Sequence, residues 1–201
     1  MPLCGSLYKN ALGRHPYASQ AIQVGILMGT GDVIAQVFVE RKEVKNLDLP
    51  RTAKFMGLGF FLVGPTLRFW YGRLEKVVKI ENPLQRTIAK MCLDQCCFAP
   101  AFLVVFTTSL STLQGLNLAE TTQRLKKDYF NILKMNYFIW PAAQLINFGL
   151  VPLNYQVIFV QFIAIIWNTY LSTKLGDKNK NMDKIVTPTR ATLTTGQLYI
   201  V

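Results

Sequence analysis

The sequence has little charge, one histidine and no recognisable catalytic motif. Only 16% of its 201 residues are charged, whereas soluble chains carry roughly 25%. The single histidine, His15, stands before a proline, and no GxSxG, Walker, GxGxxG or HExxH pattern occurs. We therefore expect no enzyme, no metal site and no cofactor. Hydrophobic residues make up 51% and the mean hydropathy is +0.24, and this composition weighs against a disordered chain.

Cysteine is also scarce. Three of the four cysteines crowd together at Cys92, Cys96 and Cys97, which is no spaced disulfide framework. Cys92 and Cys96 lie one helical turn apart without a second ligand pair. We predict that they are small packing residues.

Long stretches without charge are the strongest positive signal. Residues 135–173 contain no Asp, Glu, Lys or Arg, and Asp32 is the only such residue between His15 and Val39. A bilayer core needs roughly 20 apolar residues per helix. The pattern predicts four spans and a fifth apolar segment, at about 18–39, 53–73, 92–113, 132–151 and 155–173.

These segments predict an all-α integral membrane protein. The fold would be a bundle of four transmembrane helices with a fifth apolar C-terminal helix. The alternative is a soluble bundle, but a soluble helix keeps a polar stripe, and 155–173 is apolar nearly all round. We expect a membrane domain at 18–173, between a short amphipathic N-terminal helix at 1–17 and a polar, flexible tail at 174–201.

Basic residues gather at the span edges and give a net charge of +11. This placement suits snorkelling and contact with anionic lipid headgroups, and it does not suit direct nucleic-acid binding. With four spans, the two sides of the membrane hold twelve and nine of these bases. Such a split orients the protein only weakly.

The first span carries small and polar residues on one face. Asp32 and Gln36 follow Gly25 at i+7 and i+11, and Gly29 lies at i+4. We expect this face to contact protein, with Gly25 and Gly29 allowing close helix packing. A leucine at either glycine should harm folding more than a leucine at Gly176 in the tail.

Ionisable and amide side chains lie inside the apolar segments. Asp32 and Asp94 are predicted to face the bundle centre with Arg68 as a partner, or else to lie near the membrane interface. Polar stripes follow two of the later segments: Asn136, Trp140, Gln144 and Asn147 in one, and Gln161, Asn168 and Ser172 in the other. They would either join helices by hydrogen bonds or line an aqueous path.

Five blocks of sequence occur in a familiar order. They are Gly64-Pro65 with Trp70-Tyr71, then Leu93-Asp94-Gln95 with Phe98-Ala99-Pro100, then Trp140-Pro141 to Phe148, then Leu150-Val151-Pro152, and then Trp167-Asn168-Thr169-Tyr170-Leu171-Ser172. This set resembles the Mpv-seventeen family of small peroxisomal and mitochondrial membrane proteins over about residues 10–173. Other short motifs are most similar to the mitochondrial founding member. Two features depart from the family pattern: Gln156 replaces a basic residue after Tyr155, and the polar tail is longer.

The resemblance implies a function that the residues alone do not. It implies a four-span protein of the mitochondrial inner membrane with weakly selective channel activity for small hydrophilic solutes. It further implies a link to membrane potential and to maintenance of mitochondrial DNA. The alternatives are a non-conducting scaffold or interaction protein, in which the same polar groups join the helices, and a peroxisomal membrane pore. In each case we expect a homo-oligomer as one partner state.

Overall fold

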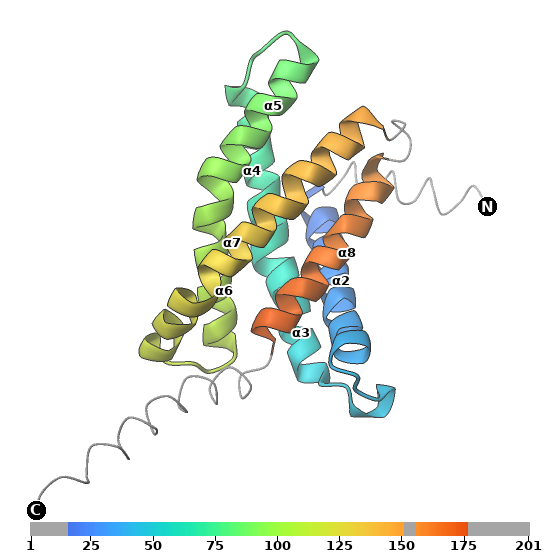
Figure 1. The fold of residues 1–201 in the computed structure, drawn as a ribbon, viewed down its shortest axis with the longest axis vertical. Helices are drawn as coiled ribbons and strands as arrows, with labels where there is room; N and C mark the ends of the chain where they lie inside the picture. Colours follow the sequence, from blue (N-terminus) through green and yellow to red (C-terminus); the bar gives the residue numbers. More distant parts are fainter. Residues whose placement is uncertain (1–15, 151–155, 177–201) are drawn as a thin grey trace, which may run out of the picture.

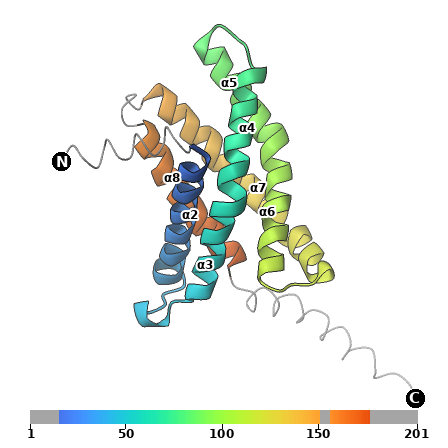
Figure 2. The same cartoon turned by 180° about the vertical axis from the view of Figure 1, so that it is seen from behind.

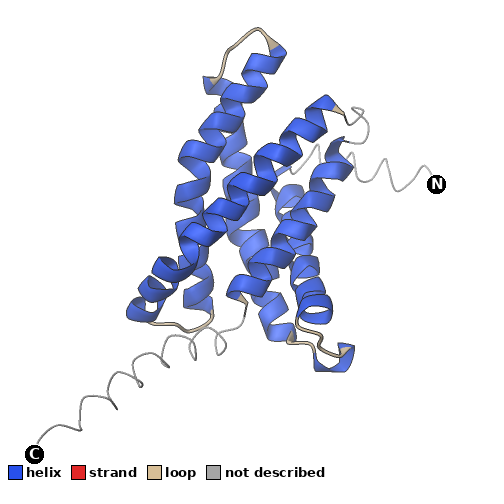
Figure 3. Cartoon of the chain, in the orientation of Figure 1, coloured by secondary structure: helices blue, strands red, loops and turns tan. Residues whose placement is uncertain are grey.

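The computed structural model describes residues 16–150 and 156–176, except the side chains of 16, 147–149 and 156–158. Within this part the chain forms helices, turns and loops and no strand (Figure 3). Several helices run directly into one another, so that five long rods result. The elements are α2 (Pro16–Ile34), η1 (Ala35–Val39), η2 (Val44–Asn46), α3 (Leu49–Leu58), η3 (Gly59–Val63), α4 (Gly64–Val77), α5 (Pro83–Leu93), η4 (Asp94–Phe98), α6 (Ala99–Leu113), α7 (Leu118–Gly149) and α8 (Gln156–Leu175).

The rods alternate in direction and form one bundle (Figure 1). Helix α2 packs against α3, α4 and α8, and α7 packs against α6 and α8, so the last described helix lies beside the first. The view from behind shows α2 and α8 side by side again (Figure 2). The predicted all-α class is confirmed, and the fifth apolar segment forms a full member of the bundle, α8. The amphipathic N-terminal segment and most of the polar tail lie outside the described residues.

Helix starts are defined by local sequence. Asn82 caps α5 by accepting hydrogen bonds from two backbone N–H groups, and Pro83 occupies the first turn. Asn117 and Glu120 form a reciprocal capping box at the start of α7. These contacts satisfy N–H groups that have no partner within the helix, so both helices begin where short loops end.

Prolines at two helix junctions coincide with wide π-helical turns. The N–H of Gly64 donates to the carbonyl of Gly59, and the N–H of Ala99 to that of Asp94, each five residues back. Pro65 and Pro100 follow directly, and a proline ring clashes with the carbonyl four residues earlier and lacks an N–H. The wider turn accommodates the ring without ending the rod. Pro141, by contrast, lies inside α7, which remains α-helical.

The rods α2 and α3–α4 approach each other through small residues. A Cβ atom added at Gly59 would lie 2.7 Å from the Cα of Gly25, and one at Gly64 would lie 2.6 Å from the Cα of Ala21. At Gly29, the nearest atoms belong to the flexible Met56 side chain. The structure therefore places Gly25 and Gly29 on the packed face, opposite two glycines that the sequence analysis did not select.

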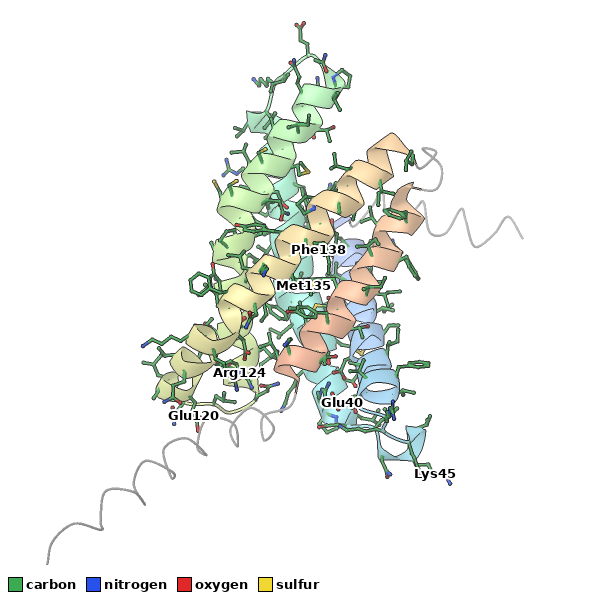
Figure 4. All side chains as sticks on the ribbon, in the orientation of Figure 1. Glu40, Lys45, Glu120, Arg124, Met135 and Phe138 are labelled. Atoms are coloured by element: carbon green, nitrogen blue, oxygen red, sulfur yellow. The ribbon has the colours of Figure 1, made fainter. Side chains whose placement is uncertain are left out.

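Large apolar side chains cover the outside of the bundle. Phe61 and Phe138 are 78% and 75% exposed, and Figure 4 shows Phe138 and Met135 along the middle of α7. By length and composition alone, two of the described helical stretches could cross a membrane, Tyr17–Val39 and Pro83–Leu113. Cys92, Cys96 and Cys97 are exposed on the second stretch, so the packing role predicted for Cys92 and Cys96 is wrong.

Candidate functional site: a buried ion-pair cluster and a central cavity

A cluster of polar side chains lies buried where α2, α3 and α8 meet. The carboxylate of Asp32 is fully buried and accepts hydrogen bonds from the Arg51 Nε at 2.8 Å and the Thr52 hydroxyl at 2.6 Å. Gln36 Nε2 donates to the same carboxylate at 2.8 Å, and the Ser172 hydroxyl also donates to it. Every one of these donors is itself buried, so the charge of Asp32 is compensated within protein.

Arg51 joins this cluster to the loop after α2. Its Nη2 lies 2.7 Å from both the Ser172 hydroxyl and a carboxylate oxygen of Glu40. Burial by itself would raise the pKa of the Glu40 carboxyl, but the hydrogen bonds and charges of Arg51 and Lys42 hold it below its usual value. Burial likewise opposes the charge of Arg51, and its two carboxylate partners outweigh that effect and raise its pKa. One guanidinium thus links three helices.

Arg68 does not take the role predicted for it. It is exposed, and its guanidinium carbon lies 5.9 Å from the ring centroid of Tyr17. The predicted partnership of Arg68 with Asp32 is wrong because Arg51 forms that ion pair. The surroundings of Gly176 also differ from those expected, because the sequence analysis assigned this residue to a flexible tail. A Cβ atom there would lie 2.4 Å from the Arg51 guanidinium.

A second arginine is buried at the same end of the bundle. Arg124 is 1% exposed, and its Nη1 donates to Gln114 Oε1 at 2.6 Å and to the Ser111 hydroxyl at 3.3 Å. Gln114 in turn donates to the carbonyls of Leu175 and Gly176. Burial lowers the pKa of Arg124, opposed in part by the charge of Asp128. Figure 4 shows Arg124 and Glu40 towards the same end of the molecule.

A cavity of about 430 Å³ lies among the rods, in the bundle centre. Most of its walls are apolar and aromatic, with contributions from Tyr71, Trp140 and Trp167. Besides Thr87 and Lys90 of α5, the lining carries carboxylate and amide side chains from three different rods: Asp94, Gln95, Asn136, Gln144 and Asn168. The structure therefore brings Asp94, three residues of the first predicted stripe (Asn136, Trp140 and Gln144) and Asn168 of the second to one cavity. Ser172 of the second stripe lies in the Asp32 cluster instead.

Hydrogen bonds order part of this polar lining. The carboxylate of Asp94 accepts from the Trp70 indole N–H at 2.8 Å and from Gln95 Nε2 at 2.9 Å. Gln95 Oε1 accepts from Asn136 Nδ2 at 2.7 Å. The buried Oε1 of Gln144 has no hydrogen-bond partner within the described part of the chain. Asp94 and Asn136 are thus linked across two rods, and Gln144 keeps an acceptor available.

The remaining residues singled out from the sequence fall at or beyond the cavity. The rings of Trp140 and Trp167 meet edge to face with their centroids 6.4 Å apart, and the ring centroids of Trp167 and Tyr170 are 5.7 Å apart. The Pro100 carbonyl accepts the Tyr129 hydroxyl at 3.2 Å. The side chain of Asn147 and the whole of Pro152 lie outside the described residues.

Fold and site together define a class: a membrane protein, helical throughout its described part, with a mostly apolar cavity among its helices that carries a few polar side chains. The model of the Mpv17 / PMP22 family matches residues 111–172. Proteins named "Mitochondrial inner membrane protein Mpv17" are 45% identical in Xenopus laevis and 41% identical in Homo sapiens, each over 83% of this chain and 94% of the relative. "Protein sym-1" of Neurospora crassa is 39% identical over 83% of this chain and 96% of its own length. No solved structure matches.

The chain belongs to the Mpv17 / PMP22 family and is a protein of the mitochondrial inner membrane. The predicted family and location are therefore confirmed.

Proposed function

We propose that the protein provides a weakly selective path for small solutes across the mitochondrial inner membrane, with the central cavity as part of that path. The observation that supports this most is the set of polar side chains inside an otherwise apolar bundle. Asp94, Asn136 and Gln144 come from the η4 and α7 segments and line the same cavity as Asn168 of α8. Polar side chains that line an internal space can replace water around a passing solute.

Solute movement through the proposed path would also account for the cellular roles that the family resemblance implies. Membrane-potential control and support of mitochondrial DNA would follow from solute movement across the inner membrane. Anionic lipids would contact the basic residues at the rod ends, and the protein would associate with itself without binding nucleic acid or catalysing a reaction. These points come from the resemblance and from the charge pattern, and each remains a proposal.

Reconstitution tests the path directly. Purified protein in planar bilayers should give stepwise conductance, and Asp94→Asn should change its size or cation preference while membrane insertion stays normal. Glu81→Gln is the matched control, because Glu81 is an exposed acid between α4 and α5. Silence at high protein load would contradict the path and support a non-conducting scaffold. A parent-like conductance in Asp94→Asn would remove Asp94 from the path.

A further inference from the structure

The cavity is lined by the carboxylate of Asp94, which has no cationic partner among the described residues. Asp94 accepts hydrogen bonds only from neutral donors, Trp70 and Gln95, among the contacts seen in the described residues. Asp32, in contrast, has its own arginine at 2.8 Å. A carboxylate has about four lone-pair positions, so Asp94 retains capacity for a donor that brings a positive charge.

The unpaired Gln144 Oε1 is a second observation of the same kind. This oxygen is buried, and its side chain lines the cavity. Buried acceptors are nearly always paired. A ligand that donates hydrogen bonds would supply the partner that the described residues do not.

The walls favour a cation with an apolar body. Tyr71, Phe98 and the two tryptophans Trp140 and Trp167 present aromatic rings to the cavity, and the faces of such rings attract cations. Lys90 is the basic residue on the lining, but its ammonium pairs with Glu75. The negative charge of Asp94 therefore decides the polarity of the interior.

We propose that the central cavity binds a small organic cation, with its ammonium group paired to Asp94 and an apolar or aromatic body against the walls. The volume of about 430 Å³ accommodates a body of ring size. This assigns a solute class to the cavity of the proposed path. The cation site rests on the proposed function only in that both use the same cavity. Binding at this site does not require that the protein conducts.

The protein carries its own reporter for such binding. The chain has three tryptophans; Trp140 and Trp167 line the cavity and Trp70 donates to Asp94. Intrinsic fluorescence in phosphatidylcholine liposomes, which add no anionic lipid, would be titrated with three probes of similar body. These are 2-phenylethylammonium, neutral 2-phenylethanol and anionic phenylacetate.

The ammonium probe should bind at least about tenfold more tightly than the alcohol, with phenylacetate weakest. Asp94→Asn should bring the ammonium probe to the affinity of the alcohol, whereas Glu43→Gln, an exposed acid in the loop after α2, should preserve the preference. Equal affinities for all three probes in the parent protein would overturn the proposal even if Asp94→Asn fails to fold. Tighter binding of phenylacetate would also overturn it and assign the cavity to anions through Lys90.

Binding and conduction separate the two proposals. Cation-selective binding in a protein that is silent in bilayers would support the cation site and contradict the path. Conductance without any preference for the ammonium probe would support the path and contradict the cation site.

Discussion

A single side chain, Arg51, holds together the end of the bundle where α2, α3 and α8 meet. It pairs with Asp32 and Glu40 and donates to Ser172. Removing it leaves the buried carboxylate of Asp32 without a counter-charge, and breaking a buried ion pair in this way costs about 3–5 kcal/mol. We expect Arg51→Gln to lower the free energy of unfolding by that amount, measured by denaturant titration in detergent.

Arg68→Gln is the matched control for that measurement. Arg68 is also a helical arginine, but it is exposed and its described contact is the Tyr17 ring. Its removal should change stability by less than about 1 kcal/mol, as for an exposed cation–π contact. Equal losses in the two variants would show that the buried cluster contributes nothing beyond a generic positive charge.

Acid should weaken the same cluster through Glu40. Its pKa is lowered from 4.5 in the folded protein because Arg51 and Lys42 outweigh the effect of burial. A carboxyl with a lowered pKa contributes stability above its unfolded pKa, and that contribution is lost as the pH falls through the folded pKa. We expect the melting temperature to fall with pH below about 4.5 more steeply in the parent than in Glu40→Gln. Parallel curves would contradict this assignment.

Residue placement shows where sequence analysis succeeds and fails. The spacing of Asp32 and Gln36 from Gly25 was enough to put them on one inward face, since helical periodicity is local. The partner of Asp32 was not predictable in the same way. Arg51 follows Asp32 by 19 residues across a loop. Arg68 lies inside a predicted span and Arg51 lies outside it, so the sequence favoured Arg68 as the partner.

At the level of elements, one close backbone contact joins α2 to the junction of α3 and α4. A methyl group at Gly59 would meet the backbone of Gly25 at 2.7 Å, and backbone cannot move aside as a side chain can. Overpacking typically costs about 1–3 kcal/mol. We expect Gly59→Ala to lower the free energy of unfolding by at least this amount. The loss should be larger than in Gly29→Ala, because the neighbour of Gly29 is the flexible Met56 side chain.

Gly72→Ala supplies the control for helix glycines. No atom lies within 4 Å of a Cβ added there, and alanine favours helix by about 1 kcal/mol over glycine, so stability should stay equal or rise. Gly176 is unsuitable for this purpose because it contacts Arg51. A loss in Gly72→Ala as large as that in Gly59→Ala would refute the close-packing argument.

The wide turns before Pro65 and Pro100 illustrate a second limit of sequence. Proline inside an apolar run predicts a disturbed helix, but a kink, a break and a π turn all satisfy the ring. The choice depends on neighbours: η3 lies against α2 at Gly25, and η4 carries Asp94 to Trp70 and the cavity. Such choices arise only when the rods pack together.

For the whole molecule, five alternating rods have a consequence for membrane topology. If α8 crosses with the others, the five bases assigned to the tail join the side of the first and third loops. The division then becomes fourteen bases against seven, in place of twelve against nine. By the positive-inside rule, the α2–α3 loop and the residues after α8 should face the matrix.

Cysteine labelling in mitoplasts measures this arrangement. In a background without the four native cysteines, Lys45→Cys and Lys178→Cys should both resist a membrane-impermeant maleimide, whereas Glu81→Cys should react. Permeabilisation should then expose the first two. Reaction of Lys178→Cys but not Lys45→Cys in intact mitoplasts would support four crossings and place the tail with the N-terminus.

The end of α8 has a further consequence for biogenesis. Ser172, Leu175 and Gly176 receive hydrogen bonds or contacts from Arg51 and Gln114, and Gln114 in turn holds Arg124. The burial of Arg51 and Arg124 thus depends on α8, the last of the described helices. A nascent or truncated chain that stops before α8 exposes both cations and lacks Trp167, so that the cavity is open on the side that α8 covers. We expect inner-membrane quality-control proteases to recognise such incomplete chains by the exposed side chains of Arg51 and Arg124.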